Sequence, residues 1–286
     1  MEDGTQKKER MIRWLCVIAG IIVAFSLFVS ALSKPVFKVS FLDVGQGDSI
    51  LIESPSGNRV LIDGGKPGSI LQPLAKALPL FARDLDVVIA THPDNDHVGG
   101  LPEVLTKYKV HSFIEPGSTG ESSTYRELER LVKDTSIPRF LARRGMVVDM
   151  GDGVRLDVLF PDRDVSLVES NTSSVILRAS YGSTTVMLTG DSPQVIERDV
   201  VRVYGNSLSS TVLKLGHHGS RTSSDELFVR AVNPQYAVVS AGAGNSYGHP
   251  HKEVIDLISR LGISVLETSK EGIIQCNSDG GSFVCD

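Results

Sequence analysis

The chain has 286 residues, of which 41 % are hydrophobic and 22 % are charged. This is enough to bury a substantial core in one large domain or two small ones, and it excludes disorder throughout. The net charge of −5 and a pI near 5.8 give no general attraction to nucleic acid, so a polyanionic substrate would need a local basic patch. Net charge therefore neither supports nor excludes a nuclease.

The N-terminal segment differs from the rest of the chain. The run from Trp14 to Leu32 has no charged residue and is preceded by Lys7, Lys8, Arg10 and Arg13. Because a membrane-spanning helix needs roughly 20 apolar residues, we predict a cytoplasmic tail over 1–13 and a single-pass membrane anchor over 14–33. The basic residues then place the remaining chain outside the cytoplasm. A cleaved signal peptide, giving a secreted protein, is the alternative, although its apolar region is normally only about 7–15 residues.

The positions of the cysteines bear on whether the chain beyond the N-terminal segment lies outside the cytoplasm. Beyond Cys16 in the apolar run, only Cys276 and Cys285 remain, and they bracket the turn-rich segment 277–282 between β-prone residues. A terminal hairpin would bring the two thiols opposite each other, and a disulfide there would suit an exported domain. Two unpaired thiols on a frayed tail are an equally good interpretation.

The first half of the remaining chain has short apolar runs separated by turn residues. We predict a meander of strands followed by helix, strand, helix, strand and helix. The predicted strands are Val39–Val44, Ser49–Glu53, Arg59–Ile62, Asp86–Ala90 and Val110–Ile114, and the predicted helices are Ile70–Leu80, Leu101–Lys107 and Tyr125–Lys133.

The second half repeats this arrangement. The predicted strands are Val154–Phe160, Val175–Ser180, Thr184–Leu188, Val212–Leu215, Tyr236–Ser240 and Ser264–Leu266, and the predicted helices are Gln194–Tyr204, Asp225–Val232 and Glu253–Leu261. Two halves of this kind favour two β-sheets packed face to face with helices outside, an α/β (α+β) fold.

Metal-binding side chains are concentrated directly after the predicted strand Asp86–Ala90. The stretch THPDNDHVGG, residues 91–100, supplies His92, Asp94, Asp96 and His97. Imidazole and carboxylate donors without thiolate suit a divalent transition metal. The following residues start a helix whose N-terminal dipole faces the same crevice.

Further ligand types follow other predicted strands. Asp191 comes after the strand Thr184–Leu188, His217 and His218 come after Val212–Leu215, and the loop 245–251 carries His249 and His251. Six of the seven histidines thus lie just beyond predicted strand ends, with His111 the exception. Strand-end loops of one sheet converge on one edge, so we predict a single metal centre there.

Six motifs together resemble the metallo-β-lactamase fold and, within it, the soluble hydrolase domain of the ComEC-type DNA-uptake proteins. They are FLDVGQGDS (41–49), LIDGG (61–65), THPDNDHVGG (91–100), LTGD (188–191), KLGHHGSRT (214–222) and YGHPH (247–251). The resemblance covers about residues 36–274 and implies a four-layer αββα sandwich, with a hydrolase domain over 36–286. The pore of the full uptake proteins has no counterpart here, so a separate DNA-translocating pore protein is an expected partner.

The resemblance implies two divalent metal ions. His92 and Asp94 would bind one ion, Asp96, His97 and His217 the other, and Asp191 would bridge them. Two departures from the broader fold matter. Asp94 stands where a second histidine is usual, and the segment Asn171–Ser174 stands where a histidine before the bridging aspartate is expected. Oxygen-rich coordination favours harder ions, so manganese is as plausible as zinc.

The resemblance also implies roles for neighbouring residues. Two ions about 3.5–4 Å apart would activate a water and stabilise the developing negative charge. The candidate catalytic residues are Asp96, His218 and His249, with a supporting hydrogen-bonding role as the alternative for His218. The candidate substrate-binding residues are Lys214, Ser220, Arg221 and Asn245. Asp43, Asp63 and Asn171 are expected to support the ligands, whereas Asp48 is expected to be a turn residue.

These expectations combine into one functional prediction, a membrane-anchored, metal-dependent phosphodiesterase or nuclease acting on DNA. A hydrolase of another ester or amide, including a lactam or lactone, is the first alternative. A non-catalytic, anchored binding module is the second. The sequence does not determine the oligomeric state.

Overall fold

The structure, a computed structural model, describes residues 4–32 and 36–286. The chain separates into two compact units, Met1–Pro35 and Val36–Asp286. In the first unit, α1 (Gly4–Leu32) is one helix. The second unit contains the sheets and all the predicted site residues.

The prediction of a membrane anchor over 14–33 is wrong. Among the residues that the structure describes, no helix combines the length and the apolar character needed to cross a bilayer. Helix α1 begins at Gly4 and takes in the charged residues that the prediction assigned to a separate tail. The predictions of a single-pass membrane location, an extracytoplasmic domain and a membrane partner are corrected with it.

The first sheet has eight strands in the order β17-β16-β1-β2-β3-β5-β7-β8. Strands β1 to β3 form an antiparallel meander, as their short apolar runs and intervening turns predict, and β5, β7 and β8 join in parallel. The strands are β1 (Phe37–Phe41), β2 (Ile50–Glu53), β3 (Arg59–Ile62), β5 (Val87–Ile89), β7 (Phe113–Glu115), β8 (Arg139–Leu141), β16 (Ile274–Ser278) and β17 (Phe283–Cys285).

The second sheet has seven strands in the order β15-β14-β13-β12-β11-β10-β9. Strands β9 to β12 are antiparallel neighbours, and β12 to β15 run parallel. The strands are β9 (Val147–Asp149), β10 (Val154–Phe160), β11 (Ile176–Tyr181), β12 (Thr184–Leu188), β13 (Val212–Lys214), β14 (Tyr236–Val239) and β15 (Ser264–Glu267). A separate pair is formed by β4 (Asp84–Leu85) and β6 (Lys109–Val110).

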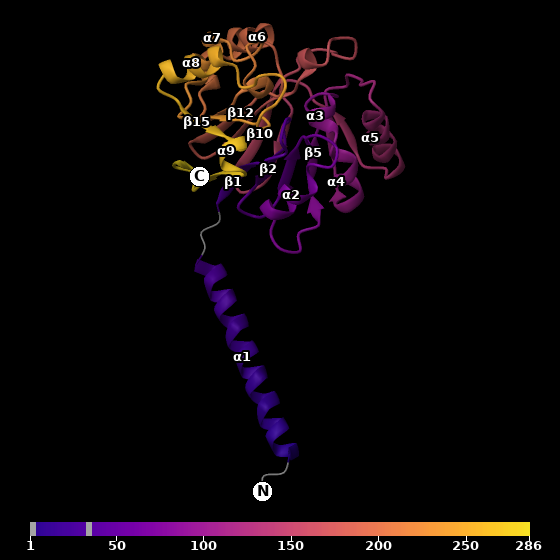
Figure 1. Ribbon diagram of the computed structural model, residues 1–286, viewed down its shortest axis with the longest axis vertical. Helices are drawn as coiled ribbons and strands as arrows, with labels where there is room; N and C mark the ends of the chain where they lie inside the picture. Colours follow the sequence, from indigo (N-terminus) through magenta and orange to yellow (C-terminus); the bar gives the residue numbers. More distant parts are fainter. Residues whose placement is uncertain (1–3, 33–35) are drawn as a thin grey trace. The chain divides into compact units, whose positions relative to one another are not determined.

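Helices pack on the outer face of each sheet, the first set drawn in purple and magenta in Figure 1 and the second, chiefly α6, α7 and α8, in orange to yellow. The first set is α2 (Leu71–Ala77), α3 (Asn95–Val98), α4 (Leu101–Lys107) and α5 (Ser123–Asp134), and the second is α6 (Gln194–Tyr204), α7 (Glu226–Val232), α8 (Lys252–Arg260) and α9 (Thr268–Glu271). Short 3₁₀ turns are η1 (Asn171–Ser173), η2 (Gly205–Leu208) and η3 (Gly216–Gly219).

Three buried clusters show the layers. One lies between the sheets and includes Phe41, Ile62, Val158 and Val186, which come from both sheets. The other two pack the helices on the outer faces. Burial of apolar surface on both faces of each sheet accounts for the near-continuous apolar runs of strands such as β12. The predicted α/β fold with two sheets and outer helices is confirmed in this unit.

The C-terminal hairpin settles the cysteine question. Strands β16 and β17 pair antiparallel with Cys276 opposite Cys285, and the two sulfurs are bonded. The disulfide interpretation is therefore confirmed, and the interpretation as two free thiols on a frayed tail is wrong.

The remaining differences between the predicted and the observed strands are local. The predicted strand Val110–Ile114 is divided between β6 and β7, and the exposed edge strands β8 and β9 were not predicted.

Candidate metal centre

Three chain segments bring the polar residues to one edge of the two sheets. His92 follows β5, and the short helix α3 carries Asp96 and His97. Asp191 follows β12. The turn η3 after β13 holds His217 and His218 at φ values of 50° and 57°, the left-handed region that few non-glycine residues adopt. This backbone allows two consecutive imidazoles to lie at one centre.

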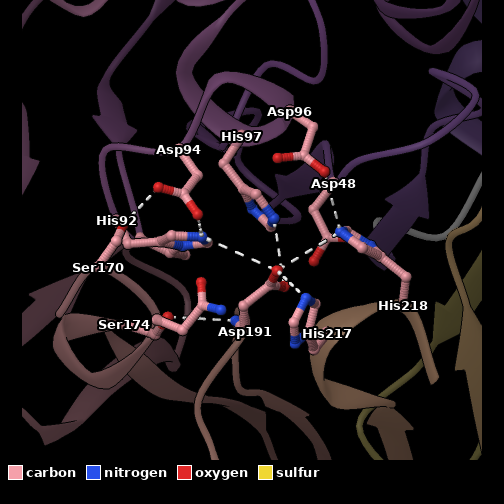
Figure 2. Close-up of polar contacts among 12 residues, drawn as sticks. Asp48, His92, Asp94, Asp96, His97, Ser170, Ser174, Asp191, His217 and His218 are labelled. Atoms are coloured by element: carbon pink, nitrogen blue, oxygen red, sulfur yellow. Dashed lines mark hydrogen bonds and ion pairs between the residues drawn. The ribbon is translucent and has the colours of Figure 1, made fainter. Parts of the chain in front are cut away.

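Asp191 is the centre of the arrangement (Figure 2). Its side chain is buried, and its two carboxylate oxygens face the Nε2 atoms of four histidines. The distances are 3.2 Å to His97, 3.5 Å to His218, 3.6 Å to His217 and 3.9 Å to His92. We call Asp191, these four histidines, Asp48, Asp94 and Asp96 the Asp191 cluster. Such a carboxylate could hold divalent metal ions, and the expected bridging of two ions stays a prediction.

The Nδ1 atoms of His92 and His97 meet in one network on Asp63. His97 Nδ1 lies 2.8 Å from Asp63 Oδ2, and the Thr91 hydroxyl donates to the same oxygen at 2.7 Å. Because the Thr91 proton is used there, its oxygen accepts from His92 Nδ1, at 2.9 Å. Both rings therefore carry a hydrogen on Nδ1, and in the neutral ring the Nε2 lone pair is free for an ion. Asp63, which the sequence analysis expected to support the ligands, thus contacts His97 directly and His92 through Thr91.

His217 is oriented in the same way by different residues. The Thr222 hydroxyl donates to Ser220 Oγ at 3.0 Å, so it accepts from His217 Nδ1, also at 3.0 Å. Ser220 is buried and acts on His217 through Thr222. The structure thus places Ser220, an expected substrate-binding residue, behind a ligand candidate. Thr222 was missed by sequence reasoning, although it lies in the quoted KLGHHGSRT motif.

The roles predicted for Asp48 and Asp43 are reversed in the structure: Asp48 supports the site, and Asp43 is the turn residue. Asp48 is buried, with Oδ1 at 3.2 Å from His218 Nδ1 and Oδ2 at 2.8 Å from Lys214 Nζ. Asp43 is exposed and accepts a turn hydrogen bond from the Gly45 backbone. Lys214, an expected substrate contact, is fully buried and donates to Asp48. Gly47, directly before Asp48, has a φ of 125°, and a side chain at this position would collide with the backbone carbonyl of Asp96.

Buried polar atoms without a hydrogen-bond partner show whether the Asp191 cluster could hold metal ions. The Nε2 atoms of His92, His97 and His218 and one oxygen of Asp191 are buried without a hydrogen-bond partner. Buried polar atoms are nearly always partnered, so these atoms require a partner of another kind. Asp48, His97, Asp191 and His218 offer one ligand atom each within 4.8 Å of one another. Imidazole and carboxylate donors at this spacing fit divalent ions.

The charges of the site agree with this interpretation. Burial lowers the pKa of His97, but the charges of Asp191 and Asp63 outweigh it and raise that pKa well above its usual value. Burial likewise opposes a charge on His218, yet Asp191 and Asp48 raise its pKa to about 9. Burial would raise the pKa of Asp191, but His97 and His218 hold it far below normal. The carboxylates stabilise positive charge at the positions where ions would bind.

The segment around η1 contacts the centre where the expected histidine is absent. Ser170 Oγ donates to Asp94 Oδ1 at 2.6 Å, and the Asp191 backbone N–H donates to Ser174 Oγ at 3.2 Å. Asp94 Oδ2 lies 3.7 Å from His92 Nε2. The Asn171 Oδ1 atom is buried without a partner. Hydroxyl groups thus replace the imidazole, and they support Asp94 and Asp191.

A cavity of about 150 Å³ opens onto the Asp191 cluster. Gln46, Tyr247 and His249 complete its walls beside the acidic residues and His217 and His218. The His249 ring stacks on Tyr247, with 5.6 Å between the ring centroids. Burial and the neighbouring His217 lower the pKa of His249 to about 4, so this ring is neutral at pH 7.

The two remaining substrate-binding candidates, Asn245 and Arg221, do not line this cavity. The Asn245 amide donates to the carbonyls of Gly242 and His249 and accepts from the His249 backbone, so it holds the loop in shape. Arg221 is exposed and contacts His251 at 3.1 Å. Its guanidinium also lies 3.7 Å from Glu253, on the surface of the protein, whereas the Asn245 amide is engaged within its own loop.

Comparison with known proteins identifies the family. A family model described as the metallo-beta-lactamase superfamily matches residues 42–243. The chain belongs to this superfamily. Igni18, a metallo hydrolase from the archaeon Ignicoccus hospitalis, has the same fold, with a TM-score of 0.53 at 15 % identity over 88 % of this chain and 98 % of its own. A metal-dependent hydrolase fold with a candidate divalent-metal cluster is thus established for this chain.

Two curated relatives place the chain within the superfamily. ComE operon protein 3 of Bacillus subtilis is 32 % identical over 94 % of this chain and 37 % of its own length. Competence protein ComA of Neisseria gonorrhoeae is 32 % identical over 83 % of this chain and 32 % of its own length. The resemblance predicted from the motifs is confirmed. The chain spans about a third of the length of these relatives.

Proposed function

We propose that this superfamily member is a metal-dependent phosphodiesterase that cleaves DNA. The observation that carries the proposal is the buried Asp191 carboxylate facing four histidine Nε2 atoms, beside an open cavity. A site built for two divalent ions suits hydrolysis of a phosphodiester, whose transition state gathers negative charge on several oxygens. The competence relative supports nucleic acid as the substrate, because competence is the uptake of DNA.

The donor set points to the ions involved. His92, Asp94 and Asp191 would hold one ion, and Asp96, His97 and Asp191 would hold the other, together with His217 or His218. When bound, such a pair lowers the pKa of water and neutralises charge on the phosphate. Carboxylates supply about half of the donors, which favours manganese at least as much as zinc. A substitution of Asp94 by histidine should therefore shift the preference toward zinc.

The chain's own residues would complete the chemistry. Asp96 is about three-quarters buried and its Oδ2 lies 3.4 Å from His218 Nε2 at the cavity wall. Although burial opposes this, His218 and His97 hold its pKa well below the usual value, so it would stay charged and could orient a water by accepting a hydrogen bond. Neutral His249 can donate a hydrogen bond to a phosphate oxygen from one ring nitrogen. Its Nδ1 is buried without a partner and is available to accept one.

A metal and substrate screen on the full chain tests the proposal. Fluorescently labelled single- and double-stranded DNA should be cleaved in the presence of manganese or zinc. Asp191→Asn should abolish cleavage and metal binding, whereas Asp43→Asn, which removes an exposed turn carboxylate, should leave both unchanged. Bound metal with no cleavage of any DNA would reject the nuclease proposal while leaving the metal centre standing.

A lactam or lactone substrate is the alternative chemistry for this fold. The same preparation should therefore be offered a chromogenic lactam and an aryl phosphodiester. Turnover of the lactam without turnover of either phosphodiester would reverse the assignment. A protein that binds less than about half an ion per chain would favour a non-catalytic binding module, because the chemistry requires two ions.

A further inference from the structure

A second cavity lies at the opposite edge of the second sheet. It has a volume of about 670 Å³ and is formed where β12, β13 and β14 begin, whereas the Asp191 cluster lies where β12 and β13 end. We call it the arginine groove. Its walls include Arg178, Ser183, Thr185, Ser209, Thr211 and Gln235. Of the described residues that line it, none is acidic.

Arg178 on β11 is the one cation among these lining residues. Its side chain is about half buried. One terminal nitrogen donates to the Ser209 carbonyl at 3.1 Å, and the Nε atom is buried without any partner. Among the residues that the structure describes, no carboxylate lies within ion-pair distance of this guanidinium. A half-buried charge that lacks a counter-ion is costly in a folded protein.

The neighbouring charges compensate Arg178 only in part, because the net shift of its pKa is downward. Its cross-strand partner on β10 is Asp157, and that carboxylate is already paired with Arg155. Burial lowers the pKa of Arg178; the negative charge of Asp157 opposes this shift, and the positive charge of Arg155 adds to it. Arg178 also borders an adjoining cavity of about 320 Å³, lined in addition by Arg155, Tyr204 and Ser207. Asp157 also lines this adjoining cavity, so Arg178 borders open space on two sides with one shared carboxylate as its neighbour.

We propose that the arginine groove binds the phosphate group of a nucleotide unit, with Arg178 as its counter-ion. A guanidinium offers several donors arranged to match phosphate oxygens, and the unpartnered Nε is one of them. The hydroxyl and amide groups of Thr211 and Gln235 suit sugar hydroxyls and base edges. The volume lies within the range of about 300–1,000 Å³ typical of small-molecule sites. The phosphate can come from a free mononucleotide or from a nucleic acid strand.

Calorimetric titration of the metal-free full chain tests this assignment. A chelator first removes the metal, so that metal ions at the Asp191 cluster cannot bind the phosphate probes. The probes are inorganic phosphate, adenosine monophosphate and a short single-stranded oligodeoxynucleotide. Arg178→Gln should weaken binding about tenfold or more, as expected for loss of a charged hydrogen-bond donor. Arg126→Gln, which removes an exposed arginine from α5 on the other layer, should leave binding unchanged.

A second variant tests the proposal in case Arg178→Gln does not fold. Gln235→Glu keeps Arg178 and the side-chain size but adds a carboxylate to the groove, and it should weaken binding of the same probes. Tighter binding of the mononucleotide than of the oligonucleotide would identify a free nucleotide as the source, and the reverse would identify a strand. The proposal is overturned if no probe binds the wild-type chain at millimolar concentration. It is also overturned if Arg126→Gln weakens binding as much as Arg178→Gln.

Discussion

Lys214 and Asp48 form an ion pair beneath the metal centre, with 2.8 Å between Nζ and Oδ2 and both side chains almost completely buried. Burial would raise the pKa of Asp48, but the positive charges of Lys214 and His218 hold it at about 2. The other Asp48 oxygen lies 3.2 Å from His218 Nδ1. The pair therefore keeps a carboxylate charged and aimed at His218, and Lys214 acts on the centre through Asp48.

Lys214→Met should destabilise the protein by about 3–5 kcal/mol, because it leaves Asp48 buried without its partner. Urea unfolding measures the loss. Lys252→Met is the matched control, since Lys252 is exposed and its pair with Asp256 is worth only about 0–1 kcal/mol. Unchanged stability of Lys214→Met, with a raised KM for substrate, would instead assign Lys214 to substrate binding.

Asp63→Asn should weaken metal binding by about 10–100-fold while the fold is kept. The substitution removes the charge that accepts from Thr91 and His97, and asparagine tolerates the φ of 59° at this position. Competition with a metal-sensitive chelator dye measures the affinity. Asp152→Asn is the control, an exposed aspartate with a similar φ of 52°. Equal affinities for the two variants would mean that Asp63 does not orient a ligand.

The Cys276–Cys285 disulfide closes a short loop, with a sequence separation of 9. Loop-closure entropy predicts that replacing both cysteines by serine costs about 2–3 kcal/mol. Thermal unfolding should show a lower Tm for this double variant and for the reduced wild-type protein. A reducing agent should have no effect on the variant. A wild-type Tm that does not respond to reduction would show that the cross-link contributes little.

Glu197 gives a stability that depends on pH. Burial raises its pKa to about 8, from 4.5, even though the backbone N–H groups of Ser224 and Asp225 donate to its two oxygens. Between these values the folded state keeps a proton that the unfolded state has lost, so this contribution to stability is complete below about pH 4.5 and falls as the pH rises toward 8.

Glu197→Gln removes this titration and one hydrogen-bond acceptor. The variant should be about 1–3 kcal/mol less stable than the wild type near pH 5, and the difference should shrink as the pH approaches 8. Urea unfolding across this pH range measures it. Glu253→Gln, at an exposed position, should track the wild type. A difference that widens with pH would show that folded Glu197 is ionised.

The strands and the chemistry at their ends could be read from the sequence. Apolar runs and turn residues predicted the bounds of α4, β10, β12 and α6 as the structure has them. The loop after β5, the Asp191 turn and the double histidine were each identified from a strand that stops at a ligand type. These are local properties, since strand ends follow from residues that are neighbours in the chain.

Only the tertiary structure decided which of two neighbouring residues faces the centre. Asp48 rather than Asp43, and His218 as well as His217, lie in the cluster because of left-handed backbone turns and the packing of two sheets. Lys214 is buried because β13 is an interior strand of its sheet and Asp48, from the loop between β1 and β2 of the other sheet, lies opposite it. The direction of a side chain at a strand end depends on contacts with residues more than 100 positions away, which no local pattern records.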